Sequence, residues 1–308
     1  MTTLLFTHEA CFAHDPGRMH PEHPARLKSV LLALGEPEFS ALERREAPEA
    51  SIEQIARVHP EAYVRDILAS VPAEGMAAID ADTFMSPGTG EAALRAAGAA
   101  ISAVDAVLAG EARNAFCATR PPGHHAEPTR AMGFCFFNNV AVAAAHARAV
   151  HGLRHVAVVD FDVHHGNGTQ AAFEADGSLF YASTHQVPLY PGTGAPSERG
   201  VGNILNVPLR PMAGGADFRH AIGEVIVPAL IDFDPDLLII SAGFDAHVDD
   251  PLASVALETD DFAWATRELI RVADMVCDGR VVSCLEGGYD LHALGEACAA
   301  HVRELMAA

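Results

Sequence analysis

The segment HVAVVDFDVHHGNGT (155–169) begins as a short, valine-rich apolar run and continues into closely spaced Asp, His and Gly residues. An apolar run of this length predicts a buried strand, and the polar residues that follow it predict a loop with a function. In open parallel sheets, ligands bind outside the carboxyl ends of the strands. The segment therefore favours an α/β protein with a site where this strand ends.

The same alternation of short apolar runs and longer Ala/Leu-rich segments extends along the chain. It predicts strands at 3–8, 114–120, 155–162, 179–184, 236–243 and 280–287, with a weaker one at 204–209. Segments with helical periodicity fall at 24–34, 91–108, 139–150, 218–230, 260–277 and 291–306. This pattern is typical of a mostly parallel sheet flanked by helices. Because no repeat or Gly/Ser linker divides it, we expect 1–308 to be a single domain.

The composition indicates a soluble globular protein and disfavours several classes of function. The chain has 308 residues, of which 50% are hydrophobic and 20% are charged, and its net charge at pH 7 is −21. This charge repels phosphate backbones and anionic membranes, so we expect no binding to nucleic acid or membranes, and it attracts cationic partners. The six cysteines show no CxxC spacing, and the first residues lack a signal-peptide pattern. We therefore expect a cytoplasmic location.

Loops that hold Gly, His, Asp and Tyr follow several of the predicted strands. They are RPPGHHAE (120–127), DFDVHHGNGT (160–169), GFDAHVDDP (243–251) and EGGYD (286–290). Because the carboxyl ends of parallel strands lie at one edge of the sheet, we expect these loops to converge.

The first group of candidate residues indicates a metal site. Asp160, Asp162 and His164 alternate with apolar residues, so an extended backbone directs all three polar side chains to one side. A polar edge strand is the alternative, but it fits poorly after an apolar run. A carboxylate and an imidazole two residues apart can bind one divalent metal, and Asp245, directly after another apolar strand, is the best further ligand. Three protein ligands leave a position open for water, as in catalytic sites.

Other residues indicate acid–base chemistry and stabilisation of an oxyanion. His124 and His125 follow a rigid Pro-Pro-Gly turn, and two adjacent imidazoles beside a metal site suit a general acid/base couple. Asp160 and Asn167 are available to orient the two rings. Tyr289 follows two glycines, which allow its phenol to face a cavity and donate a hydrogen bond to a developing oxyanion. Core packing is the alternative role for a lone histidine or a buried tyrosine.

Six segments resemble, in family order, the motifs of the metal-dependent histone deacetylase superfamily, which includes acetylpolyamine amidohydrolases and acetoin-utilisation proteins. They are RPPGHHAE, GFCFFNN, VDFDVHHGNGT, YPGTG, SAGFDAHVDDP and LEGGYD. The resemblance covers nearly the whole chain and is strongest to the class II and bacterial branches. It implies an arginase-like α/β fold with one catalytic Zn²⁺ per chain, for which Fe²⁺, Co²⁺ or Mn²⁺ can substitute.

The resemblance also implies a role for each matched residue of the site. The implied metal ligands are Asp162, His164 and Asp245. The implied catalytic residues are His125, His124, Tyr289, Asp160 and Asn167. Among these, His125 is the general base and later the acid, and His124 is an electrostatic helper paired with Asp160. Asn167 stands where class I members carry Asp, so we expect His125 to be less basic than in those relatives.

Substrate contacts and a K⁺ ion follow from the same resemblance. Phe134, beside Gly133 in GFCFF, and Tyr190 in YPGTG match the aromatic walls that hold the acyl-lysine methylenes in relatives. The second wall is more often Phe, and core packing is an alternative for both residues. Leu252 occupies a position where a polyamine-selective relative has an acidic residue. The residues implied to contribute to a K⁺ site near the metal loop are Asp160, Asp162, His164 and Ser183.

The sequence thus predicts a zinc-dependent amidohydrolase that removes acetyl groups from N-acetylated amines by attack of metal-activated water. Acetyl-lysine in peptides or proteins is the first substrate, and acetylpolyamines or other small acylated amines are the second. One alternative is a two-metal ureohydrolase, but it would leave the HH and GGY loops without a role. Another is an inactive acyl-binding module, which predicts that a metal ligand, a catalytic His or the Tyr is missing, and none is missing here. The sequence leaves open the native metal, the acyl-length preference, assembly into a homo-oligomer and the role of the His- and Pro-rich segment 8–24.

Overall fold

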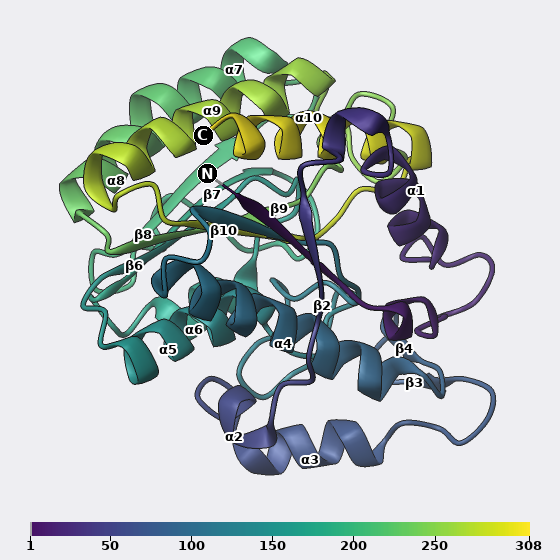
Figure 1. Cartoon of the computed structure of the whole chain (residues 1–308). Helices are drawn as coiled ribbons and strands as arrows, with labels where there is room; N and C mark the ends of the chain where they lie inside the picture. Colours follow the sequence, from purple (N-terminus) through teal and green to yellow (C-terminus); the bar gives the residue numbers. More distant parts are fainter. Residues whose placement is uncertain (1) are drawn as a thin grey trace.

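Eight strands form one sheet in the computed structural model, which describes residues 2–308 (Figure 1). In chain order they are β1 (Thr3–Thr7), β2 (Glu43–Glu46), β5 (Asn114–Cys117), β6 (Val156–Asp160), β7 (Leu179–Gln186), β8 (Ile204–Leu209), β9 (Leu237–Ala242) and β10 (Val281–Leu285). Their order across the sheet is β2-β1-β5-β10-β9-β6-β7-β8, and every neighbouring pair is parallel. A parallel sheet of this kind requires cover on both faces.

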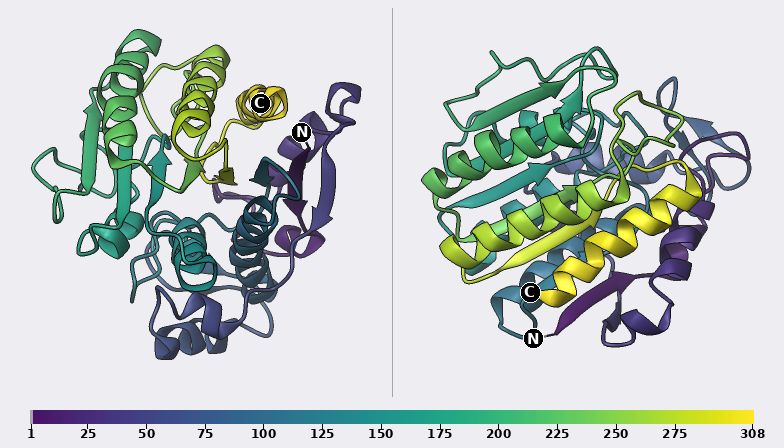
Figure 2. Two further views of the ribbon diagram at one scale, coloured as in Figure 1. Left: turned by 60° about the vertical axis from the view of Figure 1, so that its left-hand side comes forward. Right: turned by 90° about the horizontal axis from the view of Figure 1, so that it is seen from above.

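Helices supply that cover and produce three layers (Figures 1 and 2). One layer contains α1 (Ala25–Ala33), α7 (Gly215–His220), α8 (Val227–Phe233), α9 (Thr259–Val276) and α10 (Leu291–Ala307). The other contains α2 (Ile52–Ile55), α3 (Glu61–Ala69), α4 (Thr89–Leu108), α5 (Asn139–His151) and α6 (Asn167–Phe173). The predicted fold class, a single α/β domain with a sheet flanked by helices, is confirmed.

The apolar core is divided between the two faces of the sheet. Along β9, Leu238 and Ile240 belong to the cluster beneath α7 to α10, whereas Leu237 and Ile239 belong to the cluster beneath α4 and α5. Successive side chains of a strand point to opposite faces, so an unbroken apolar run is what a doubly covered strand requires. This is why the apolar runs were good predictors of the central strands.

Several elements were not predicted because their stability does not come from an apolar run. The edge strand β2 has the sequence ERRE and pairs with β1 through its backbone. The short strands β3 (Ala77–Ala78) and β4 (Phe84–Met85) pair with each other outside the main sheet. The predicted helix 218–230 is divided into α7, a π-helical turn (Ala221–Ile226) and α8.

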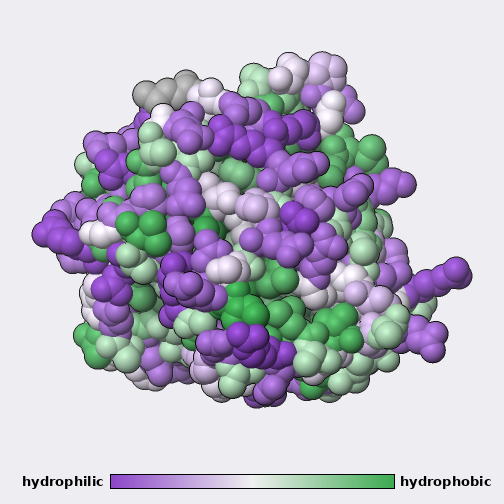
Figure 3. All heavy atoms as spheres, turned by 60° about the horizontal axis from the view of Figure 1, so that its bottom comes forward, coloured by the Kyte–Doolittle hydropathy of each residue, from purple (hydrophilic) through white to green (hydrophobic). Residues whose placement is uncertain are grey.

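The face of the molecule drawn in Figure 3 is chemically mixed. Figure 3 turns the lower side of Figure 1 forward and shows hydrophilic residues interspersed with hydrophobic ones over that face. Within residues 2–308, none of the helices combines the length and the apolar character needed to cross a membrane.

Candidate active site

The loops predicted to converge follow β5, β6, β9 and β10, which are neighbours at the centre of the sheet. His124 and His125 come from the loop after β5, Asp162 from the loop after β6, Asp245 from the loop after β9 and Tyr289 from the loop after β10. Since the four strands are parallel, their carboxyl ends lie at the same edge of the sheet. The sheet order therefore explains how residues more than 160 positions apart reach one site.

Asp162, His164 and Asp245 form a buried group in which one potential ligand atom of each lies within 4.8 Å of the others. His164 Nδ1 lies 3.2 Å from Asp162 Oδ1 and 3.1 Å from Asp245 Oδ2. Burial and the negative charge of Asp162 raise the pKa of Asp245 to about 7. Two buried carboxylates this close repel each other, and a cation held between them would offset that repulsion.

The backbone around Asp162 is shaped by side-chain carboxylates rather than by sheet pairing. The N–H of Asp162 donates to Asp160 Oδ1 at 3.1 Å, and the N–H of His164 donates to Asp162 Oδ1 at 2.9 Å. The N–H of Val163 donates to Asp245 Oδ1 at 2.8 Å. Because these donors leave the sheet, the strand ends at Asp160, and the predicted strand 155–162 began one residue early and extended two residues past this end. Asp162 and His164 thus meet in a turn and not on an extended backbone.

Glycine lets the backbone approach the two carboxylates closely. A Cβ atom on Gly287 would lie 2.1 Å from Asp245 Oδ2 and 2.6 Å from Asp162 Oδ2. The Gly287 N–H donates to Asp162 Oδ2 at 2.8 Å, which fixes the orientation of that carboxylate. Two carboxylates and one imidazole, held in this way, fit a divalent cation.

A second group of potential ligands in the described chain, Asp105, His146 and His151, lies between α4 and α5. Both imidazole Nε2 atoms lie 2.7 Å from Asp105 Oδ1. The guanidinium of Arg57 lies 2.9 Å from His146 Nδ1, and a guanidinium can only donate. His146 therefore carries its proton on Nε2 and donates it to Asp105, which is a hydrogen-bonded arrangement and not a metal-binding one.

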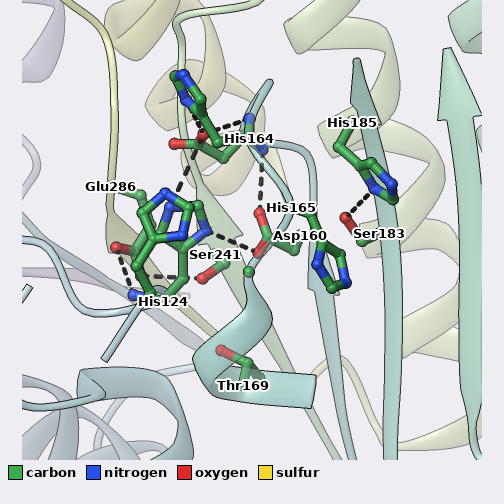
Figure 4. Close-up of polar contacts among 12 residues, drawn as sticks. His124, Asp160, His164, His165, Thr169, Ser183, His185, Ser241 and Glu286 are labelled. Carbon is green, nitrogen blue, oxygen red and sulfur yellow. Dashed lines mark hydrogen bonds and ion pairs between the residues drawn. The ribbon is translucent and has the colours of Figure 1, made fainter. Parts of the chain in front are cut away.

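His124 and His125 are buried side by side, with their ring centroids 4.0 Å apart. The Nδ1 atom of His124 lies 3.0 Å from Asp160 Oδ2, a contact drawn in Figure 4. The Nδ1 atom of His125 lies 2.9 Å from Asn167 Oδ1. The structure thus places each ring against the orienting acceptor proposed from the sequence.

The surroundings of the two imidazoles drive their pKa values apart. Burial lowers the pKa of His124, but the carboxylates of Asp162 and Asp160 outweigh burial and raise it to about 10. Burial holds the pKa of His125 well below its usual value, and positive charge on His124 and His164 lowers it further. One ring is therefore cationic near neutral pH while its neighbour is free to accept a proton, a division typical of acid–base sites.

Tyr289 lies at the same edge of the sheet. Its backbone N–H donates to Asp250 Oδ2 at 2.7 Å, and its ring centroid lies 5.9 Å from that of Phe134 in an edge-to-face contact. The guanidinium carbon of Arg26 stands 4.8 Å from the centroid of the Tyr289 ring. Burial holds the pKa of Tyr289 well above 10, so its hydroxyl stays protonated and able to donate.

The residues expected to contact substrate have different surroundings. Tyr190 is partly exposed, and its ring centroid lies 5.1 Å from that of His125. Gly133 has a φ of +56°, and a Cβ atom there would lie 2.4 Å from Cδ2 of His125. Leu252 is partly buried in the loop after β9, where its N–H donates to Asp250 Oδ1 at 3.0 Å. Phe134 and Tyr190 thus adjoin the candidate catalytic residues, and Leu252 is linked to Tyr289 through Asp250.

The residues implied for K⁺ lie next to the metal group. Ser183 is opposite Asp160 in the register of β6 and β7. Its hydroxyl lies 2.9 Å from His185 Nδ1, a contact drawn as a dashed line in Figure 4.

Two buried acids in the site had no role assigned from the sequence. Glu286, within LEGGYD, accepts from the backbone N–H of Gly123 at 2.7 Å and from the Ser241 hydroxyl at 2.9 Å. Glu22, in the segment 8–24, is fully buried, lies 3.0 Å from the Arg26 guanidinium, and also pairs with Arg120. The sequence shows that Glu286 belongs to a motif and that Glu22 lies near prolines. It does not show that either carboxylate is buried.

Comparison with known proteins identifies the family. The histone deacetylase domain matches residues 20–305. The histone deacetylase-like amidohydrolase of Pseudomonas aeruginosa is 44% identical over 87% of this chain and 71% of its own length. The human protein named polyamine deacetylase HDAC10 is 36% identical over 99% of this chain and 48% of its own length.

A solved structure agrees with this assignment. The crystal structure of the HDA15 HD domain has a TM-score of 0.93 and 34% sequence identity, covering 99% of this chain and 89% of that one. Family members of this kind are hydrolytic deacetylases. The chain therefore belongs to the histone deacetylase family and is an amide deacetylase.

Proposed function

We propose that the chain is a zinc-dependent deacetylase of N-acetylated primary amines, with acetyl-lysine in peptides or proteins as its preferred substrate. The observation that carries this proposal is the convergence of Asp162, His164 and Asp245 with the paired histidines at one edge of the sheet. A divalent cation held by those three residues supplies a Lewis acid for the acyl carbonyl and for water. Fe²⁺ and Co²⁺ also suit this donor set.

The protein's own residues supply the proton transfers. His125 is neutral, so it accepts the proton of the attacking water, with Asn167 holding its Nδ1 atom in one tautomer. His124 stays protonated beside Asp160 and contributes positive charge where negative charge develops. The protonated His125 then donates to the leaving amine. The products are acetate and a free amine.

Tyr289 stabilises the oxyanion that forms on the acyl oxygen. Burial keeps its hydroxyl protonated, so the hydroxyl donates a hydrogen bond as charge develops. The edge-to-face contact with Phe134 and the Arg26 guanidinium over its ring limit the positions that the phenol can take. We assign Phe134, Gly133 and Tyr190 to the walls around the acyl chain and Leu252 to the rim.

The net charge of −21 favours cationic substrates, whether lysine-rich peptides or polyamines. Leu252 supplies no negative charge with which to select a free polyamine ammonium, so we rank acetyl-lysine first. The human relative's printed name, polyamine deacetylase, supports acetylpolyamines as the second candidate.

The test is a comparison of kcat/KM for an acetyl-lysine peptide and for acetylputrescine, using enzyme reconstituted with Zn²⁺, Fe²⁺ or Co²⁺ in turn. We expect the peptide to be hydrolysed faster and Zn²⁺ to support turnover. Faster hydrolysis of acetylputrescine would reverse the ranking of substrates. The Tyr289→Phe variant should lose about 10²- to 10³-fold in kcat with little change in KM, as for other oxyanion donors. Full activity of that variant would refute the site assignment.

A further inference from the structure

Glu286 is the first residue after β10, and its carboxylate is fully buried. Its Oε2 atom accepts from the backbone N–H of Gly123 at 2.7 Å and from that of His124 at 3.2 Å. Its Oε1 atom accepts from the Ser241 hydroxyl at 2.9 Å. Figure 4 shows Glu286 beside His124 and Ser241, with dashed lines marking the contacts among these residues.

The backbone of Glu286 is held as firmly as its side chain. Its N–H donates to the carbonyl of Ala242 at 2.9 Å, which extends the pairing of β10 with β9. Its carbonyl accepts from the Arg26 guanidinium, which also donates to the carbonyl of Gly288 at 2.5 Å. Tyr289 directly follows Gly288. The start of its loop is therefore held both by the pairing with β9 and by Arg26.

We infer that Glu286 is a positioning residue, which joins the loop of His124 and His125 to the loop of Tyr289 through hydrogen bonds. This inference rests on the proposed function, in which His125 and Tyr289 act on the same acyl group. A general base and an oxyanion donor assist each other only when their distance and orientation match the reacting carbonyl. Glu286 is the residue whose side chain contacts one of these loops while its backbone begins the other.

The length of the side chain matters more than its charge in this role. Burial raises the pKa of Glu286 to about 7, and the three groups that hydrogen-bond to its carboxylate are uncharged donors, two backbone N–H groups and one hydroxyl. A glutamine keeps an oxygen that can accept from the N–H groups of Gly123 and His124, and its amide can donate to Ser241. An aspartate is shorter by one methylene and cannot span the same gap.

The test compares Glu286→Ala, Glu286→Gln and Glu286→Asp in the metal-loaded enzyme. We expect the alanine and aspartate variants to lose about 10- to 100-fold in kcat, as for a catalytic group misplaced by about 1 Å, with KM nearly unchanged. The glutamine variant should stay within about threefold of the wild type because it keeps the hydrogen bonds. Ser241→Ala should have a smaller effect than Glu286→Ala, because the bonds to Gly123 and His124 remain.

Ser283→Ala is the matched control, since Ser283 is a buried polar residue of the same strand and its hydroxyl lies 2.9 Å from His301 Nε2. It should lower stability without lowering kcat. Equal losses of kcat in the glutamine and alanine variants would overturn the inference, because they would show that the negative charge of Glu286 matters and not its hydrogen bonds. Full activity of Glu286→Ala would also overturn it. If the alanine variant does not fold, the order of the glutamine and aspartate variants decides.

The two proposals fail in different ways. Unimpaired turnover by His125→Ala and Tyr289→Phe would refute the proposed function. Inactive His125→Ala and Tyr289→Phe variants together with a fully active Glu286→Ala variant would refute only the inference on Glu286.

Discussion

The Nδ1 atom of His125 lies 2.9 Å from the amide oxygen of Asn167, a partner that orients the ring without adding negative charge. Replacing Asn167 by Asp adds that charge, which stabilises the imidazolium and raises the pKa of His125. His125 must be neutral to accept a proton, so the acidic limb of the kcat/KM profile should move to higher pH, by about 1 unit. A pH–rate profile measures this shift.

The matched background for this variant is Glu127→Gln. Asn167 Nδ2 donates to Glu127 Oε1 at 2.8 Å, so two carboxylates would otherwise face each other. The Glu127→Gln single variant shows the effect of the background alone. Movement of the acidic limb toward lower pH would contradict the role given to Asn167.

Gly133→Ala should impair catalysis through the position of His125. A Cβ atom there lies 2.4 Å from the His125 ring, on a backbone with a φ of +56° that L residues rarely adopt. The matched control is Gly152→Ala, which has a similar φ of +71° but no atom within 4 Å of the added carbon. Both variants should lose about 1 kcal/mol of unfolding free energy from backbone strain. Only Gly133→Ala should also lose about tenfold or more in kcat.

Denaturant titration and steady-state kinetics on both glycine variants provide the readout. Equal kcat values in the two would show that the ring of His125 can move without loss of function.

Metal removal should destabilise the wild type by an amount that depends on Asp245. A cation that binds only the folded state at 100 times its Kd adds about 2.7 kcal/mol of stability. We expect a chelator to lower the Tm of the wild type by several degrees and that of Asp245→Asn by less. The apo form of Asp245→Asn should be at least as stable as the apo wild type, because burial and repulsion from Asp162 raise the pKa of Asp245.

Asp105→Asn is the control for the second group of potential ligands. Its chelator-induced change in Tm should equal that of the wild type, because the Asp105 group is hydrogen-bonded. A smaller chelator-induced change in Tm for Asp105→Asn would show that metal binds to the Asp105 group.

Buried His301 should make the fold sensitive to acid. Its nitrogens lie 2.6 Å from the Thr266 hydroxyl and 2.9 Å from the Ser283 hydroxyl, and burial lowers its pKa to about 3. The unfolded chain takes up this proton near pH 6.5, so the stability is complete above that pH and is lost as the pH falls toward 3. Between pH 7 and pH 5, His301 alone should account for about 2 kcal/mol.

Urea titrations at pH 7 and pH 5 measure this difference for the wild type and for His301→Gln. The glutamine cannot titrate, so its loss between the two pH values should be smaller by about 2 kcal/mol. His292→Gln, at an exposed position of the same helix, should leave the loss unchanged. An identical pH dependence in the wild type and His301→Gln would contradict the prediction.

The sequence predicted those parts of the fold and site that depend on apolar patterning and on parallel topology. A strand such as β9 is buried on both faces and therefore shows as an unbroken apolar run. The convergence of the loops followed from their place after such strands. The actual adjacency of β5, β10, β9 and β6 did not follow, because the order of strands in a sheet is set by packing between distant segments.

The missed features are charges whose burial only the tertiary structure reveals. Glu286 lies in a turn and Glu22 lies near prolines, positions where charged residues are usually solvated. Each is compensated by partners far away in the chain, such as Gly123 for Glu286 and Arg120 for Glu22. Local patterns do not indicate such partners, so the burial of Glu286 and Glu22 could not be predicted from the sequence.

The position of β10 determines when the enzyme can become active during translation. This strand is the last one of the sheet to be synthesised, yet it lies between β5 and β9 in the sheet. Glu286 and Tyr289 follow it in the sequence. A nascent chain that stops before residue 281 leaves the edges of β5 and β9 unpaired and open to other strands. Deacetylation should therefore begin only after the C-terminal strand is inserted, with no partly active form preceding it.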